Sequence, residues 1–203
     1  MASMFKKLYT IEMEQVSVCE QNHRHKVEEE DLSLHLNIVE NMTGKKLTTL
    51  SAVLKAYFDI ENIEEPCYEC NSKKRLQREL VSGPDVLVVQ LKRFNNVQVN
   101  DQLVIQKEGH NIEMNEKLNF GDHSYILRSF ISHEGSNCAG GHYKCIGICE
   151  ETGLSFCADD DKVRQISHKK MFHLLKASYV LLYERKGEGR EEELGKLVSK
   201  EGN

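Results

Sequence analysis

The clearest alternation of apolar and polar positions in the chain runs from residue 32 to residue 39. Successive side chains of a strand point to opposite faces, so a period of two predicts a half-buried strand. His35 occupies a polar position and is expected to face solvent. The apolar positions expected to face the core are Leu32, Leu34, Leu36 and Ile38.

Other stretches predict more strands and few helices. Residues 86–91 are almost continuously apolar, which is typical of a central strand buried on both faces. Helical spacing of apolar residues predicts a helix over 47–58, and a turn with a short helix is expected over 163–175. Shorter strands are expected within 16–25, 113–120, 125–133, 143–148, 154–157 and 178–184, with a weak hairpin of 97–99 against 103–105. The predicted fold class is therefore α+β, dominated by antiparallel strands.

Composition and charge exclude several classes of protein. The chain has 203 residues, a formal net charge of −5 and seven cysteines. Nucleic-acid-binding domains are usually basic, so no nucleic-acid partner is expected. No stretch approaches the roughly 18 consecutive apolar residues of a membrane span, and the first residues lack the apolar core of a secretory signal. We therefore expect no membrane partner and an intracellular location, in the cytoplasm or nucleus, with reduced thiols.

A pair of cysteines points to a metal site. Cys67 and Cys70 have the two-residue spacing of a zinc knuckle. Cys19 is the expected third ligand, and either His23 or His25 is the fourth. Four protein ligands leave no open coordination position, so the zinc would be structural. The alternative is that these are unrelated thiols that hold no metal.

A histidine follows two glycines at Gly140 to Tyr143. Glycine lacks a Cβ and tolerates positive φ, so a substrate chain can approach the backbone closely there. The strand that follows and the strand at 154–157 are joined by a turn containing Gly153, which predicts a hairpin. Such a hairpin can bring a carboxylate at the end of its second strand beside His142. A carboxylate in that position orients an imidazole and stabilises its protonated form.

Several stretches occur in the order found in one enzyme family. The chain resembles the ubiquitin-specific cysteine proteases in its histidine box, in a strand ending Lys-Arg-Phe and in a short strand between them. The matching stretches are Gly140 to Tyr143, Ala158 to Val163, Ala177 to Tyr183, Leu87 to Phe94, and Leu118 with Phe120. The family's Asn-Thr-Cys-Tyr element, which carries the nucleophilic cysteine, does not occur in this sequence.

The resemblance implies the palm and fingers of a papain-like cysteine protease, with the thumb subdomain missing. Residues 1–15 would be an N-terminal extension without thumb helices, and 16–185 the catalytic domain. Within that domain the fingers span about 16–80 and the histidine box about 123–185. Residues 186–203 would form a disordered charged tail. The family usually has two cysteines where this chain has Cys19 and His23.

The resemblance also implies an activity and its residues. The activity is hydrolysis of peptide or isopeptide bonds after the C-terminal glycine of ubiquitin, with no cofactor for catalysis. His142 would be the base, Asp159 would orient it, and Asp160 is the second candidate for that role. Gly140, Gly141 and Tyr143 would line the cleft for the ubiquitin tail, and ubiquitin or ubiquitinated proteins would be the partners.

The nucleophile has no candidate in the right context. None of four cysteines near the histidine box lies at a helix N-terminus, where a thiolate would be stabilised, so we interpret them as packing residues. They are Cys138, Cys145, Cys149 and Cys157. The chain alone is therefore predicted to be inactive, as the C-terminal portion of an active deubiquitinase. The alternatives are a pseudo-protease that binds ubiquitin or a partner, and a zinc-stabilised scaffold without ubiquitin contact.

Overall fold

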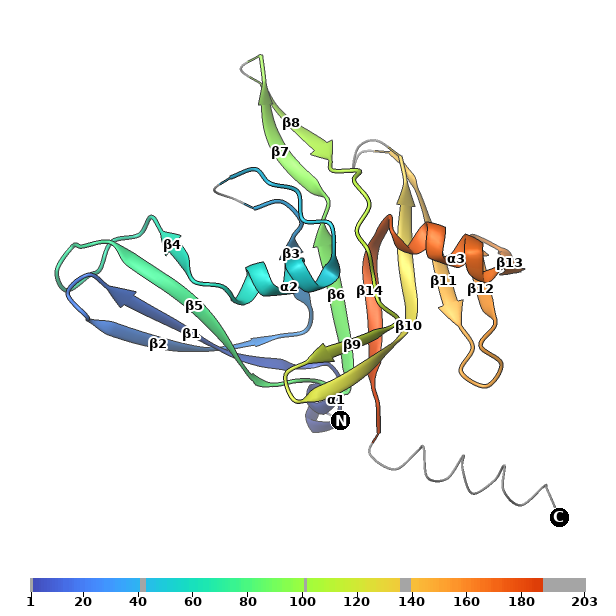
Figure 1. The fold of residues 1–203 in the computed structure, drawn as a ribbon, viewed down its shortest axis with the longest axis horizontal. Helices are drawn as coiled ribbons and strands as arrows, with labels where there is room; N and C mark the ends of the chain where they lie inside the picture. Colours follow the sequence, from blue (N-terminus) through green and yellow to red (C-terminus); the bar gives the residue numbers. More distant parts are fainter. Residues whose placement is uncertain (1, 41–42, 101, 136–139, 188–203) are drawn as a thin grey trace.

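The computed structural model describes residues 2–40, 43–100, 102–135 and 140–187. Within these residues the chain forms two sheets, a separate hairpin and three helices (Figure 1). The predicted α+β class, dominated by antiparallel strands, is confirmed. The charged tail expected at 186–203 falls outside the described residues from position 188 onward, and Cys138 also falls outside them.

A four-stranded sheet extends to one side of the molecule (Figure 1). Its strand order is β2 (Arg24–Asp31), β1 (Ile11–Cys19), β5 (Lys74–Ser82) and β4 (Glu61–Ile63). Strand β1 begins ahead of residue 16, and a short helix, α1 (Ala2–Tyr9), precedes it. Ile11 and Met13 are at most 1% exposed, so the first part of β1 belongs to the hydrophobic core.

An eight-stranded sheet forms the body of the molecule. Its main path is β13 (Lys162–Ile166), β12 (Ser155–Asp159), β11 (His142–Ile148), β10 (His123–Glu134), β14 (Ser178–Arg185), β6 (Val86–Lys92) and β3 (Leu34–Asn37). Strand β9 (Lys117–Phe120) pairs with β10 off this path. Strands β3 and β6 are parallel, and every other pairing between these described strands is antiparallel.

The weak hairpin predicted around residue 100 is present. Strands β7 (Phe94–Val99) and β8 (Gln102–Lys107) pair with each other in a two-stranded ribbon, with Val97 opposite Val104. Figure 1 shows that this ribbon stands away from the two larger sheets. Its base returns to the eight-stranded sheet next to the start of β14, where Arg93 bonds the Ser178 carbonyl.

Helix α2 (Leu50–Phe58) packs against β3 and β5 and so contacts both sheets. The prediction that it starts at residue 47 is wrong. Thr49 is the N-cap, and its hydroxyl oxygen accepts a hydrogen bond from the Ala52 N–H at 3.1 Å. Leu47 is still buried, but as extended chain whose N–H donates to the Ile38 carbonyl.

The helix predicted near the C-terminal end is shorter than expected. Helix α3 spans His168–Leu175 and is capped by Ser167, and it lies over β10. Residues 163–166, predicted as turn and helix, instead belong to strand β13, which pairs with β12. The cause is local: the turn at Asp160 and Asp161 folds this stretch back onto β12 as a hairpin, and only Ile166 of it is buried.

The alternation at 32–39 is confirmed except at its first position. Leu34, Leu36 and Ile38 are at most 1% exposed and His35 faces solvent. Leu32 is 52% exposed, because it lies in the bend between β2 and β3 rather than in a strand.

Strand β6 is central, but only one of its faces is fully buried. Leu87, Val89 and Leu91 are completely buried, while the positions between them are partly exposed, which corrects the prediction of burial on both faces. None of the helices within the described ranges is long and apolar enough to cross a membrane.

Candidate active site and metal centre

His142 and Asp159 meet at one end of the β11–β12 hairpin. His142 is the first residue of β11 and Asp159 the last residue of β12, and the register pairs Cys145 with Ala158. The His142 Nε2 atom forms a short hydrogen bond with Asp159 Oδ1. The two side chains are 40% and 43% exposed, so a reacting group can reach the imidazole. The structure therefore brings together the histidine and the carboxylate that the hairpin pattern predicts.

The charges around this pair shift the two pKa values apart. The hydrogen bond that His142 donates to Asp159 and the negative charge of Asp160 raise the pKa of His142 above its usual value. The hydrogen bond with His142 and the nearby Lys144 ammonium lower the pKa of Asp159. Lys144 Nζ lies 3.6 Å from Asp159 Oδ2 and 2.8 Å from Glu134 Oε1. These shifts favour the protonated form of His142 next to the ionised form of Asp159.

Asp160 is close to the pair but sits in a different backbone environment. It begins the two-residue turn between β12 and β13, with a φ of 52°. Its carboxylate, the Asp159 carboxylate and the His142 imidazole have ligand atoms within 4.8 Å of one another. Asp159, which ends a paired strand and directly bonds the imidazole, is better placed than Asp160 to orient the histidine.

The two glycines before His142 differ in the space available for a side chain. Neither has a φ in the left-handed region, so the expected need for positive φ does not arise. A Cβ at Gly141 would lie 2.0 Å from His133 Nε2 and 2.7 Å from the Glu134 carbonyl oxygen. A Cβ at Gly140 would meet no atom within 4 Å among the described residues. Gly141 is therefore required by close packing inside the protein.

An aromatic cluster lies behind the histidine, and sequence reasoning did not find it. His133 is 5% exposed, and its ring centroid is 4.7 Å from that of Tyr143 and 5.3 Å from that of Phe94. Tyr179 packs edge-on to Phe94 at 5.6 Å. Tyr143 is half exposed, so it has one face on this cluster and one toward solvent. The sequence feature that could have indicated this cluster is the presence of aromatic residues on several predicted neighbouring strands.

The described thiols near His142 are poorly suited to be nucleophiles. Cys145 lies on the face of β11 opposite to His142, because their positions differ by an odd number. Burial and the neighbouring Cys157 raise the pKa of the Cys145 thiol. Cys157 packs against the hydrophobic core, and the Cys149 thiol donates to Glu151 Oε2 at 3.1 Å.

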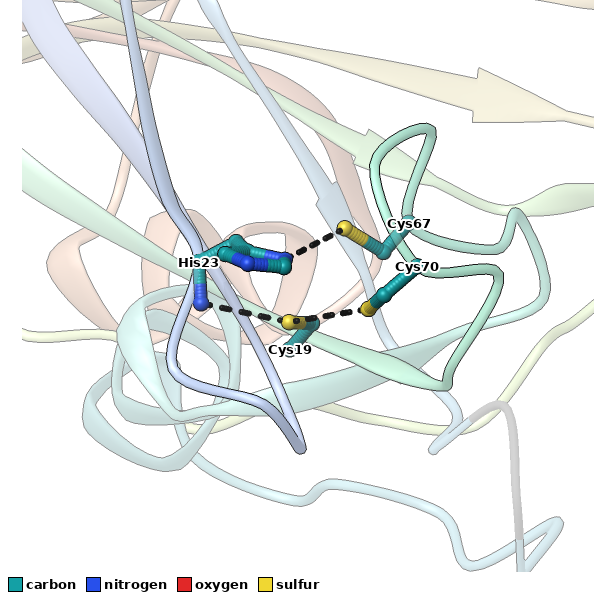
Figure 2. A group of neighbouring side chains, drawn as sticks. All are labelled: Cys19, His23, Cys67 and Cys70. Carbon is teal, nitrogen blue, oxygen red and sulfur yellow. Dashed lines mark hydrogen bonds between the residues drawn. The ribbon is translucent and has the colours of Figure 1, made fainter.

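A second cluster lies where β1 ends and the chain turns into β2. Figure 2 shows its side chains. Its members are Cys19, His23, Cys67 and Cys70, whose ligand atoms all lie within 4.8 Å of one another. The Cys19 and Cys70 sulfur atoms are 3.7 Å apart, and Cys67 Sγ is 3.7 Å from His23 Nδ1. Zinc–sulfur bonds of about 2.3 Å in a tetrahedron give a sulfur–sulfur separation of about 3.8 Å. The four donors therefore fit a tetrahedral metal ion.

Two tight turns present these ligands. Asn22, between Cys19 and His23, has a φ of 65°. Asn71, directly after Cys70, has a φ of 57°. The His23 N–H donates to Cys19 Sγ at 3.2 Å, and Ser72 Oγ lies 3.1 Å from Cys70 Sγ. The Ser72 hydroxyl and backbone lower the pKa of Cys70 to about 6, which favours its thiolate form.

The sequence allows either His23 or His25 as the fourth ligand, and the structure gives the two histidines different surroundings. His23 belongs to the four-residue cluster. His25 is held by other groups: its Nδ1 hydrogen-bonds the Tyr68 hydroxyl at 2.8 Å, and its Nε2 lies 3.3 Å from Glu69 Oε1. His25 Nε2 is also 4.0 Å from Cys67 Sγ, which puts it beside the cluster rather than in it.

Comparison with known proteins identifies related sequences and folds. Ubiquitin carboxyl-terminal hydrolase 15 of Homo sapiens is 30% identical over 168 residues, covering 77% of this chain and 17% of that protein. Ubiquitin carboxyl-terminal hydrolase 23 of Arabidopsis thaliana is 26% identical over 178 residues, covering 76% of this chain and 18% of that protein. The chain thus spans less than a fifth of the length of these relatives.

A solved structure shares the fold. It is the SAGA Ubp8/Sgf11/Sus1/Sgf73 DUB module bound to ubiquitin aldehyde, with a TM-score of 0.73 and 25% identity, covering 91% of this chain and 43% of that chain. The sequence model of the family described as ubiquitin carboxyl-terminal hydrolase matches residues 1–183. The chain therefore belongs to the ubiquitin carboxyl-terminal hydrolase family.

Proposed function

We propose that this chain is the palm and fingers portion of a deubiquitinating cysteine protease, which hydrolyses peptide or isopeptide bonds after the C-terminal glycine of ubiquitin. The observation that carries the proposal is the hydrogen bond between His142 and Asp159 at the open end of the β11–β12 hairpin. Family membership supports it, as do relatives named for ubiquitin hydrolysis and a similar structure described as bound to ubiquitin aldehyde.

The geometry of the pair suits a general base. In this proposal the Nε2–H of His142 donates a hydrogen bond to Asp159 Oδ1, which leaves the lone pair on Nδ1. Nδ1 can take the proton of a thiol, and the resulting thiolate attacks the carbonyl carbon of the terminal glycine. The imidazolium then passes its proton to the leaving amine, and water hydrolyses the thioester. Asp159 stabilises the imidazolium throughout, and the Asp160 charge adds to this effect.

The thiolate itself comes from outside these 203 residues. The sequence holds no Asn-Thr-Cys-Tyr element, and the described thiols near His142 point away from it, pack in the core or bond Glu151. The chain alone should therefore bind ubiquitin without hydrolysing its derivatives. A pseudo-protease is the less favoured interpretation, because a binding module has no chemical need for a paired histidine and aspartate.

Substrate contacts belong on the exposed side of the same hairpin. Tyr143 and Gly140 are exposed, and Gly140 leaves open space where a side chain would begin. A substrate tail that ends in two glycines would lie along this open surface next to His142. Gly141 would contribute indirectly, because the absence of a Cβ lets the backbone before His142 lie against the His133 ring.

The fingers hold a structural zinc ion in this proposal. Cys19, His23, Cys67 and Cys70 are its ligands, and the fit of their separations to a tetrahedron supports this assignment. Zinc would supply no chemistry to the reaction, because four protein ligands complete its coordination. It would join the β1–β2 turn to the turn before β5.

The test combines affinity with covalent capture. Ubiquitin binding is measured by calorimetry, using ubiquitin and a variant that lacks its two C-terminal glycines. In parallel, the chain is treated with ubiquitin whose C-terminus carries a thiol-reactive group, and any adduct is mapped by mass spectrometry. We expect measurable binding that weakens without the two glycines, and no adduct.

Two outcomes would contradict the proposal in different ways. Absence of binding to either form of ubiquitin would remove ubiquitin as the partner. An adduct on a cysteine of this chain that disappears in His142→Ala would show that the nucleophile is in the chain. The variant His35→Ala, an exposed histidine on β3, is the matched control.

A further inference from the structure

His133 is a buried histidine that the proposed reaction does not use. It lies on β10 directly opposite Tyr143 on β11, one pair away from Glu134 opposite His142. Its imidazole is packed between the rings of Phe94 and Tyr143, and its Nδ1 has no hydrogen-bond partner among the described residues. An unpartnered polar atom at this depth is costly, so the ring must be retained for another reason.

The reason is visible at Gly141. The His133 ring occupies the space that a Cβ at position 141 would need, with Nε2 at 2.0 Å and Cε1 at 2.7 Å from that point. Backbone and ring are therefore in contact at the residue immediately before His142. A ring that moved toward Gly141 would therefore push against the backbone that leads into β11.

Two groups at the base of the β7–β8 ribbon hold His133 in place. Phe94 and Lys107 face each other across that ribbon. Phe94 packs edge-on against the His133 ring, while Lys107 Nζ donates to the His133 carbonyl at 2.5 Å and to the Gly135 carbonyl at 3.0 Å. A single ammonium thus bonds the backbone on both sides of Glu134, whose carboxylate in turn bonds Lys144.

We propose that His133, held by Phe94 and Lys107, is a positioning residue that sets the backbone before His142 and thereby the hydrogen bond of His142 to Asp159. The proposal rests on the proposed role of His142 as the base. The contacts run without a gap from Lys107 to His133, from His133 to Gly141, and from Gly141 along the chain to His142.

The electrostatic setting agrees with a packing role. Burial and the nearby Lys107 ammonium lower the pKa of His133, so its ring is neutral at physiological pH. His142 shifts in the opposite direction because of Asp159. Two histidines on neighbouring strands therefore titrate apart, and NMR can follow them separately.

The experiment records imidazole nitrogen and proton NMR spectra of the whole chain. The readouts are the protonation state of His142 Nε2, the downfield proton of its bond to Asp159, and the pH at which His142 titrates. The test variants are Gly141→Ala, Lys107→Met and His133→Ala. Their matched controls are Gly140→Ala, where a Cβ meets open space, and Lys92→Met, an exposed lysine.

We expect each test variant to lose the downfield proton and to lower the titration point of His142, while both controls keep the wild-type signals. Leu118→Ala on β9 separates this effect from general instability, since it should lower the melting temperature without changing His142. Lys107→Met keeps the proposal testable if His133→Ala fails to fold.

The proposal is overturned if Gly141→Ala and Lys107→Met leave the His142 signals unchanged, or if Leu118→Ala alters them equally. These spectra do not depend on ubiquitin. If the test variants leave the His142 signals unchanged while the chain still binds ubiquitin, only the positioning role of His133 is rejected. If the variants change the His142 signals as expected but the chain does not bind ubiquitin, the proposed substrate is rejected instead.

Discussion

At the scale of single residues, the site depends on opposed pKa shifts within one hydrogen bond. The bond to Asp159 raises the pKa of His142 from its usual 6.5, and the bond to His142 lowers that of Asp159 from 3.8. The histidine therefore stabilises the fold below pH 6.5, and this contribution is lost as the pH rises through its raised pKa. The aspartate stabilises the fold above pH 3.8, and its contribution is lost as the pH falls through its lowered pKa.

Asp159→Asn tests this linkage. Its expected effects are a lower titration point for His142 and a loss of unfolding free energy that is largest between pH 3.8 and 6.5. Urea unfolding across the pH range, together with histidine NMR, measures both effects. Asp161→Asn changes an exposed carboxylate in the same turn and should leave both quantities as in the wild type. Equal pH profiles for Asp159→Asn and the wild type would rule out the linkage.

At the scale of elements, the finger turns are joined by the backbone pairing of β1 with β5, which reaches Cys19 and Lys74, and by side chains beyond it. The β1–β2 turn and the turn before β5 are far apart in sequence, and the cluster of Cys19, His23, Cys67 and Cys70 connects them. A metal ion bound only by the folded form stabilises it by mass action, by about 2.7 kcal/mol when its free concentration is 100 times its dissociation constant.

Removing zinc should therefore loosen the fingers. We expect one zinc per chain by elemental analysis, and a lower melting temperature after chelation that is restored by adding zinc. Cys67→Ser should remove both the zinc and the chelator effect, whereas Cys149→Ser, outside the cluster, should keep both. Full metal content in Cys67→Ser would contradict the ligand set.

At the scale of the whole molecule, Arg93 joins segments from three regions of the chain. It is 1% exposed, and its guanidinium donates to four backbone carbonyls rather than to a carboxylate. The acceptors are Ser178 at 2.6 Å, His110 at 2.9 Å, Lys176 at 3.1 Å and Glu108 at 3.2 Å. Burial lowers the pKa of Arg93 to about 10, so the side chain stays charged at neutral pH. These bonds fix the base of the β7–β8 ribbon against the start of β14.

Arg93→Met should destabilise the protein by more than about 3 kcal/mol, because it leaves four carbonyls without their donor in a buried site. Chemical denaturation measures the change. Lys92→Met, at the neighbouring exposed position, should change the unfolding free energy by less than about 0.5 kcal/mol. A similar small change for Arg93→Met would mean that water replaces the guanidinium at these carbonyls.

Local patterns in the sequence were sufficient for several features. The burial of Leu34 and Leu36 follows from a period of two, which is a property of any strand. The pairing of β11 with β12 follows from a short turn between two strand-forming stretches, and its register places His142 and Asp159 at the same end of the hairpin. The family resemblance added the roles of these residues, which patterning alone does not specify.

Features that depend on contacts between distant segments could be decided only by the tertiary structure. His23 lies within the cysteine cluster while His25 bonds Tyr68, a residue 43 positions away in the chain. Gly141 is a glycine because of the ring of His133, and Arg93 is buried because four carbonyls converge on it. The sequence determined what each segment can form, and long-range packing determined which neighbours each side chain meets, since burial and hydrogen bonding are settled only once the segments are assembled.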